Sequence, residues 1–118
     1  MEKKNLDWKH IGFAYHTTDY RYVADYKDGK WQEGYMSDSP NIVLNECAGI
    51  MQYCQEVFEG LKAYETADGR IVTFRSDLNA DRMYHSAERM EMPPYPKERF
   101  IEAVEKVVKA NEAWVPPY

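Results

Sequence analysis

The 118-residue sequence has only two cysteines, six glycines and six prolines. Two cysteines, Cys47 and Cys54, do not make a disulfide framework and lack the spacing of a zinc site, so we expect two reduced thiols. The few glycines form no phosphate-binding loop, which excludes a Rossmann or P-loop domain. No apolar run approaches the ~20 residues of a membrane span, and the polar start predicts no signal peptide. These absences favour a cytoplasmic protein that contacts no membrane.

Positive charge is also scarce, because 15 Lys and Arg against 20 Asp and Glu give a net charge of −5. Nucleic-acid binding is therefore disfavoured, since phosphate neutralisation needs a basic excess. The three histidines, His10, His16 and His85, show no metal-ligand spacing, so no metal site is expected. Hydrophobic residues, by contrast, make up 44% of the chain and aromatic residues 14%, which is typical of a folded domain. The length predicts a single domain over residues 1–118, with an irregular segment at 1–18.

Alternating apolar residues and turn signals predict two β-hairpins. The dipeptides Asp28-Gly29 and Asp68-Gly69 are typical of tight hairpin turns. The expected segments are a hairpin of 20–26 with 30–32, a loop at 34–40, a short strand-like run at 42–44, and a hairpin of 61–64 with 71–74.

Helical spacing of apolar residues predicts three helices. The first covers 48–58 and ends at Gly60, and the second begins at the N-cap Ser76 and stops before Pro93-Pro94. The third begins at Pro96. The expected buried residues are Ile50, Met51, Cys54 and Val57, then Leu78, Met83, Ala87 and Met90, then Phe100, Ile101, Val104, Val107 and Val108. Antiparallel strands with grouped helices predict an α+β fold, a mostly antiparallel sheet with two to three packed helices.

Arg75 lies where a buried strand meets the start of a helix. A helix N-terminus presents free N–H groups, and an arginine beside it makes an anion-binding position. Taken alone, an arginine in this position is more often an ordinary surface residue.

Tyrosine, phenylalanine, glutamate and lysine side chains could also take part in binding or catalysis, but each has a simpler structural interpretation. Tyr53 and Phe58 are more often core aromatics than ligand contacts. Glu56 and Glu59, three apart, are expected to face water and not to form an acid–base pair. Lys62 is expected on the polar face of a strand, which disfavours a covalent role for its amine.

One segment, Met51 to Tyr64 with the core Phe58-Glu59-Gly60-Leu61-Lys62-Ala63, closely resembles branched-chain amino acid aminotransferases of fold type IV. The resemblance continues through 68–71, 74–83 and 86–90, to Pro93 and then to 114–116. Good correspondence covers 47–118. The combination of Phe-Glu-Gly-Leu-Lys-Ala with a downstream Phe-Arg-x-Asp-x-Asn-x-x-Arg-Met is specific.

The resemblance implies a pyridoxal phosphate enzyme that moves an amino group between leucine, isoleucine or valine and 2-oxoglutarate. By the same resemblance, Arg75 binds the cofactor phosphate, Tyr53 and Phe58 line the pocket for the aliphatic side chain, and Gly60 lies close to the ligand. The sequence departs from the family at Gln52, Cys54 and Ser76, which are not expected ligand contacts. The family's N-terminal pocket aromatic corresponds to Ile11 or Phe13, and the choice stays open.

The resemblance also implies that the chain is the smaller, N-terminal domain of a two-domain, homodimeric enzyme of branched-chain amino acid biosynthesis. The lysine that carries the cofactor is expected beyond Tyr118, so this chain supplies no catalytic residue and is expected to be inactive alone. The alternatives are a D-amino acid aminotransferase or an aminodeoxychorismate lyase on the same fold, or a non-catalytic domain.

Overall fold

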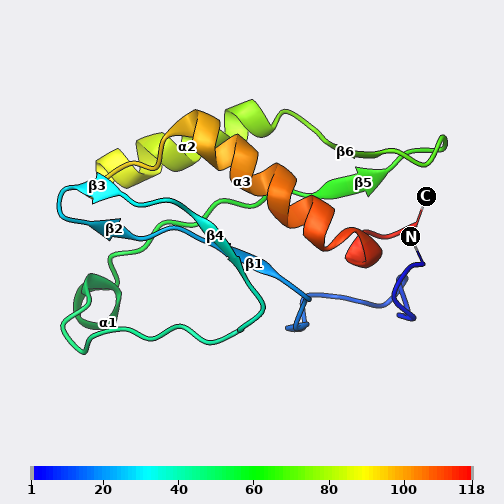
Figure 1. Ribbon diagram of the computed structural model, residues 1–118, viewed down its shortest axis with the longest axis horizontal. Helices are drawn as coiled ribbons and strands as arrows, with labels where there is room; N and C mark the ends of the chain where they lie inside the picture. Colours follow the sequence, from blue (N-terminus) through cyan, green and yellow to red (C-terminus); the bar gives the residue numbers. More distant parts are fainter. Residues whose placement is uncertain (1, 118) are drawn as a thin grey trace.

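The computed structural model describes residues 2–117 (Figure 1). The elements are β1 (Arg21–Val23), β2 (Tyr26–Lys27), β3 (Lys30–Trp31), β4 (Tyr35–Ser37), α1 (Gly49–Tyr53), β5 (Ala63–Glu65), β6 (Ile71–Thr73), α2 (Ser76–Arg89), α3 (Lys97–Ala110) and the 3-10 turn η1 (Glu112–Trp114). The predicted α+β class with antiparallel strands is confirmed, although the strands form three separate two-stranded sheets and not one. The lysine expected beyond Tyr118 lies outside the described residues.

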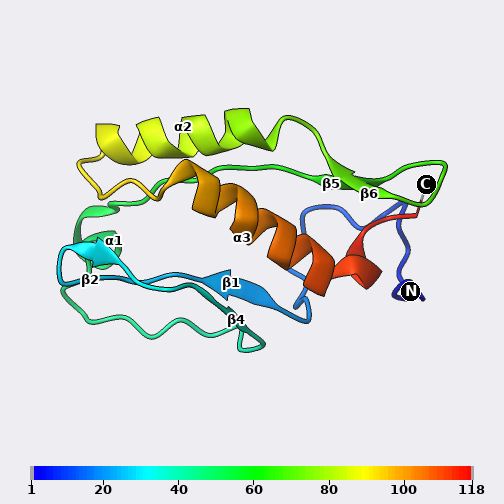
Figure 2. The ribbon, with the colours of Figure 1, turned by 45° about the horizontal axis from the view of Figure 1, so that its top comes forward.

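The two long helices pack side by side, and α3 lies between α2 and the strands β1 and β4 (Figures 1 and 2). The β5–β6 hairpin forms one end of the molecule and α1 lies at the other. The N-terminal segment runs beside the C-terminal turn, where the Lys4 amide donates to the Ala113 carbonyl oxygen at 3.0 Å. Chain segments far apart in sequence thus meet at the hairpin end.

The first hairpin is longer than predicted and contains a bulge. Strands β2 and β3 pair around Asp28-Gly29, where both residues have positive φ, as the turn signal predicts. Beyond them β1 pairs with β4, with Val23 opposite Tyr35. Two residues, 24–25, therefore face three, 32–34, which is the arrangement of a β-bulge. The predicted strand 20–26 is split by this bulge, and the loop expected at 34–40 is wrong where β4 forms.

The second hairpin forms around Asp68-Gly69 as predicted, but β5 begins at Ala63 and not at Leu61, and β6 ends at Thr73. Gly69 has φ 79°, a left-handed conformation that glycine adopts without strain. The Thr66 amide donates to the Arg70 carbonyl oxygen at 2.8 Å and closes the loop between β5 and β6.

Helices α2 and α3 confirm the predicted segments, with corrections to the first residue of α2 and to the burial of both helices. The residue that precedes α2 is Arg75 and not Ser76, which is already helical. The buried residues of α2 are Asn79, Ala80 and Ala87, whereas Leu78 and Met90, expected in the core, are 45% and 38% exposed. The buried face is therefore rotated from the predicted stripe. On α3, the apolar residues predicted to be buried are only half-buried.

The helix predicted over 48–58 is wrong beyond its first turns. Helix α1 has five residues, Gly49–Tyr53, and ends at Cys54, whose φ of 52° is left-handed, and not at Gly60. Its apolar residues find no partner, because Met51 is 65% exposed. A short helix without tertiary packing is marginal in water, so spacing alone does not extend it. The run at 42–44 is likewise exposed and forms no strand.

The fully buried hydrophobic core is small. Among residues 2–117, the buried hydrophobic side chains are Ala80, Ala87, Ala113 and Val115. Many larger apolar residues are half-buried and border an open groove, described below. No helix in this part of the chain is long and apolar enough to cross a bilayer.

Candidate functional site

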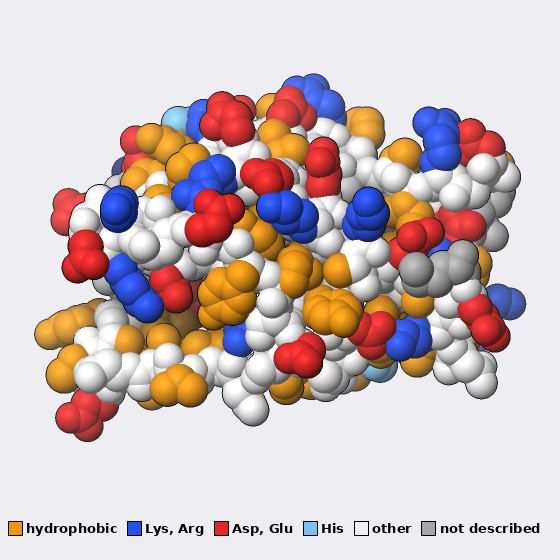
Figure 3. All heavy atoms as spheres, viewed as in Figure 1, with side chains coloured by type: hydrophobic (Ala, Val, Ile, Leu, Met, Phe, Trp, Pro, Cys, Tyr) orange, Lys and Arg blue, Asp and Glu red, His pale blue; other side chains and the backbone are white. Residues whose placement is uncertain are grey.

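An apolar groove of about 820 Å³ is lined by residues of α3, of β1 and of the segment that leads into β5. It is lined by Thr18, Tyr20, Arg21, Tyr22, Ala24, Trp31, Phe58, Glu59, Gly60, Leu61, Ala63, Met83, Tyr95, Phe100, Ala103, Val104, Val107 and Val108. In Figure 3, charged side chains cover the region over α2 and α3, and hydrophobic side chains come to the surface below them. Most lining residues are hydrocarbon or aromatic, so the groove suits an apolar ligand or chain segment.

The edge of the groove is formed by an irregular segment, 54–62, that carries no helix or strand. Three residues fasten this segment to α2. The side-chain amide of Asn79 donates to a Glu59 carboxylate oxygen at 2.8 Å and to the Gly60 carbonyl oxygen at 3.0 Å. Arg82 donates to both Glu59 carboxylate oxygens, from Nε at 2.9 Å and from a terminal nitrogen. We call Glu59, Asn79 and Arg82 the glutamate cluster.

The Glu59 side chain is only 7% exposed, so the expectation that it faces water is wrong. Hydrogen bonding from Arg82 outweighs the desolvation of the carboxyl group and lowers the pKa of Glu59, with smaller contributions from Asn79 and the Gly60 amide. The carboxylate in turn raises the pKa of Arg82. A carboxylate is buried at this position because a paired cation and two further donors compensate its lost hydration.

Phe58 and Gly60, two of the expected substrate-binding residues, both line the apolar groove. The Phe58 side chain is 87% exposed and stands between this groove and a second hollow of about 590 Å³ beside α2. A Cβ added at Gly60 would lie 3.5 Å from Cζ of Phe58, so the glycine and the ring are in van der Waals range. The structure brings these two residues together, and their role stays a prediction.

Tyr53 lies elsewhere, at the end of α1, and its side chain is 85% exposed. It borders a shallow hollow with Arg89 and Met90, at the C-terminal end of α2. The side-chain amide of Gln55 donates to the Met90 carbonyl oxygen at 3.0 Å and holds this region against the helix end. Tyr53 does not line the groove that Phe58 borders.

Arg75, the expected phosphate-binding residue, lies at the opposite end of α2. The helix has 14 residues, or about 20 Å at 1.5 Å per residue. Arg75 occupies the predicted corner between β6 and α2, in a left-handed conformation with φ 51°. The structure therefore does not bring Arg75 and Tyr53 into one cavity.

The guanidinium of Arg75 is already paired with an anion. It donates from Nε to Asp77 at 2.9 Å and from a terminal nitrogen at 2.6 Å. This pairing raises the pKa of Arg75 and lowers the pKa of Asp77. The Asp77 carboxylate, two residues along the chain, thus lies beside the guanidinium at the N-terminus of α2, where a negative charge is favoured.

An aromatic cluster closes one end of the groove and was not anticipated from the sequence. Trp31 donates from Nε1 to the Pro94 carbonyl oxygen at 2.8 Å, and its ring lies 4.8 Å from that of Tyr95. Burial and the neighbouring Tyr22 raise the pKa of Tyr95 to about 12. The sequence shows the aromatic residues but gives no sign of their contact, because Trp31 and Pro94 are 63 positions apart.

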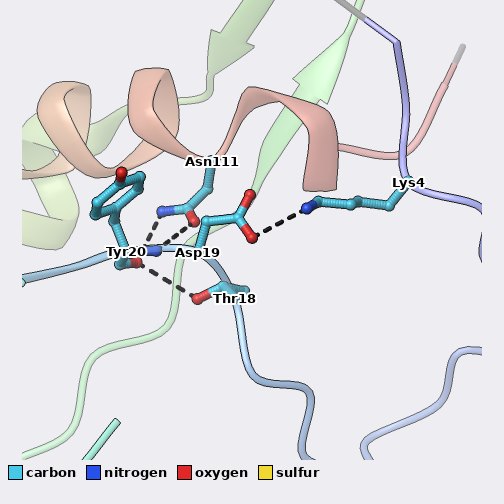
Figure 4. Close-up of polar contacts among 5 residues, drawn as sticks. All are labelled: Lys4, Thr18, Asp19, Tyr20 and Asn111. Carbon is cyan, nitrogen blue, oxygen red and sulfur yellow. Dashed lines mark hydrogen bonds and ion pairs between the residues drawn. The ribbon is translucent and has the colours of Figure 1, made fainter. Parts of the chain in front are cut away.

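Asn111, at the end of α3, binds the chain segment that precedes β1 (Figure 4). It accepts a hydrogen bond from the Tyr20 amide at 2.9 Å and donates to the Tyr20 carbonyl oxygen at 2.8 Å. Beside it, Lys4 pairs with Asp19 at 3.0 Å and lowers the pKa of that carboxyl. Asn111 therefore holds the chain segment that leads into β1 against the end of α3.

The remaining candidate residues show no organised site. Lys62 is exposed and precedes β5. Cys47 and Cys54 are free and exposed. Within the part of the chain that the structure describes, no group of three metal-ligating side chains comes together.

No protein-family model matches the chain. Curated proteins match it over almost its whole length. A branched-chain-amino-acid aminotransferase of Haemophilus influenzae is 47% identical over 115 residues, which are 98% of this chain and 34% of the relative. A protein of the same name from Helicobacter pylori is 43% identical, with the same coverage of each chain. A methionine aminotransferase of Arabidopsis thaliana is 42% identical over 114 residues, 96% of this chain and 32% of the relative.

The chain thus spans about a third of the length of the curated relatives that it matches. The matched region includes both halves of the motif, around Phe58 and around Asn79, because the alignments leave out only a few residues of the chain. The resemblance predicted from the sequence is confirmed, and over 98% of its residues the chain is similar to branched-chain amino acid aminotransferases.

Proposed function

We propose that this chain is the smaller, N-terminal part of an enzyme that transfers an amino group between a branched-chain amino acid and 2-oxoglutarate. One observation carries the proposal: the two halves of the motif, around Phe58 and around Asn79, contact each other through Glu59 at the edge of an apolar groove. The 47% identity to a protein named for this activity supports it.

The corner at Arg75 suits the phosphate of pyridoxal phosphate, because a guanidinium and a helix N-terminus there already attract the Asp77 carboxylate. A phosphate that binds Arg75 has to share the guanidinium with Asp77 or displace it. The cofactor, when bound, would supply the electron sink that allows proton removal from the amino acid. Arg75 itself would orient the cofactor by bidentate hydrogen bonds and would take no part in proton transfer.

The apolar groove supports an aliphatic substrate. The side chains of leucine, isoleucine and valine are hydrocarbon only, and each buried CH₂ group contributes about 0.8 kcal/mol. Phe58 and Gly60 border the groove where such a side chain would lie. Tyr53 lies outside the groove, so its proposed part in the pocket rests on the motif alone. A relative named for methionine is nearly as similar as the others, so we propose an aliphatic side chain and not one particular amino acid.

We further propose that the enzyme is a homodimer, acts in the cytoplasm and serves branched-chain amino acid biosynthesis. Two observations support the first two statements. Large apolar side chains are exposed on the described surface, among them Phe13 and Val43, which a second protein surface would cover. The two cysteines are free and exposed, which suits a reducing compartment.

The test is amino transfer by the full-length protein that contains this chain, purified with pyridoxal phosphate. Formation of glutamate from 2-oxoglutarate with leucine, isoleucine or valine as donor is the expected result. Activity with D-amino acids only, or cleavage of aminodeoxychorismate without amino transfer, would identify another enzyme on this fold. Binding of partners without turnover would identify a non-catalytic domain.

A further inference from the structure

The glutamate cluster is a concentration of polar contacts at the edge of the groove, in which the Glu59 side chain is 7% exposed and that of Arg82 64% exposed. Asn79 and Arg82 are three residues apart on α2, so their side chains share one face of the helix. Both reach Glu59, which lies 20 and 23 residues earlier in the chain. Asn79 is itself only 8% exposed.

The cluster acts on a segment that has no regular structure of its own. Residues 54–62 form neither helix nor strand, so local backbone pairing does not define their conformation. Four side-chain hydrogen bonds from α2 converge on Glu59 and on the Gly60 carbonyl group. Glu59 lies between Phe58 and Gly60 in the chain. Hydrogen bonds that hold the Glu59 carboxylate and the Gly60 carbonyl group therefore also restrict the positions of Phe58 and Gly60.

We propose that Asn79 and Arg82 are positioning residues that, through Glu59, hold Phe58 and Gly60 in the arrangement that receives the substrate side chain. This inference rests on the proposed function for the identity of the substrate. The geometry of the cluster stands without it. Small displacements of a contact surface reduce productive binding strongly, so loosening this segment weakens recognition of an apolar side chain.

The chain offers a closely matched control for Asn79. Asn111 is also 8% exposed, and its side-chain amide also donates to two acceptors, the carbonyl oxygens of Tyr20 and Val107. Replacing either asparagine by alanine removes a buried amide and its hydrogen bonds. Only Asn79 contacts the segment that carries Phe58.

The experiment compares Asn79→Ala, Asn111→Ala and the milder Arg82→Lys in the full-length protein with pyridoxal phosphate. Lysine keeps the charge but loses the bidentate geometry of the guanidinium. Amide hydrogen exchange of 57–62 is measured first, and it needs no catalytic activity. The KM for leucine and kcat are measured on the same preparations.

The expected result is faster exchange in 57–62 and a KM for leucine raised roughly tenfold in Asn79→Ala, with kcat changed less. Arg82→Lys is expected to show a smaller change in the same direction, and Asn111→Ala to leave the exchange of 57–62 as in the wild type, because Asn111 makes no hydrogen bond to that segment. Unchanged exchange in Asn79→Ala and Arg82→Lys would overturn the inference. So would equal changes in the exchange of 57–62 in Asn79→Ala and Asn111→Ala, or altered exchange in Asn79→Ala with an unaltered KM for leucine. A wild-type protein inactive with leucine would contradict the proposed function alone, since exchange still tests the cluster.

Discussion

The contact between Asn111 and the strand entry at Tyr20 is expected to be a major source of stability. Alanine at position 111 removes three hydrogen bonds: one from the Tyr20 amide at 2.9 Å, and two to the carbonyl oxygens of Tyr20 and Val107 at 2.8 and 2.9 Å. Each is worth about 1 kcal/mol net when both partners are desolvated. The loss is therefore about 3 kcal/mol, a large part of the ~5–15 kcal/mol that stabilises a typical domain.

The effect should appear as a lower urea midpoint with an unchanged slope, because the folded structure loses stability and not compactness. Asn41→Ala is the control, since Asn41 is exposed, and it should change the unfolding free energy by less than about 0.5 kcal/mol. A loss below about 1 kcal/mol in Asn111→Ala would refute the argument. It would mean that water replaces the asparagine and that the contact in Figure 4 does not fix β1.

Three further predictions concern charge and the cofactor. In the full-length protein, Arg75→Ala should weaken the affinity for pyridoxal phosphate at least tenfold, as measured by spectroscopic titration. The control Arg70→Ala, in the β5–β6 turn, should leave this affinity unchanged. Equal affinity in the two variants would show that Arg75 is an ordinary surface residue. Because the pKa of Glu59 is lowered on folding, its stabilisation is complete above the ordinary value of 4.5 and is lost as the pH falls through the lowered pKa. The difference in unfolding free energy between wild type and Glu59→Gln should therefore shrink in acid, and a constant difference would contradict the ion pair. The 118-residue chain alone should show no leucine turnover with pyridoxal phosphate, and borohydride reduction followed by mapping should label no single lysine stoichiometrically.

Local signals account for the parts of the fold that the sequence predicts well. The turns at Asp28-Gly29 and Asp68-Gly69 depend on residues that tolerate positive φ, so they are visible in a few letters. Helix α3 could be predicted from the helical spacing of its apolar residues and from Pro96, because proline is tolerated at the start of a helix but not in its interior. The corner at Arg75 is predictable for the same reason, since strand and helix signals meet there.

Features that depend on distant partners could not be predicted. Strand β4 exists because β1 lies beside it, and its three residues carry no alternation of their own. Helix α1 shows the converse, because an apolar face without a partner does not sustain a helix. Glu59 was expected to face water since its burial depends on Asn79 and Arg82, more than 19 residues away. The three-residue spacing of Asn79 and Arg82 was the one feature of the sequence that could have indicated this cluster.

The most direct test of the central claim is whether Phe58 recognises the aliphatic side chain. The measurement is KM for leucine and for glutamate in the full-length wild type, in Phe58→Ala and in the control Tyr64→Ala, an exposed aromatic on β5 outside the groove. The account predicts that Phe58→Ala raises KM for leucine more than for glutamate, because the leucine side chain can make apolar contacts only. Tyr64→Ala should leave both values unchanged. An equal rise for the two substrates in Phe58→Ala would show that the ring supports the fold and does not select the substrate.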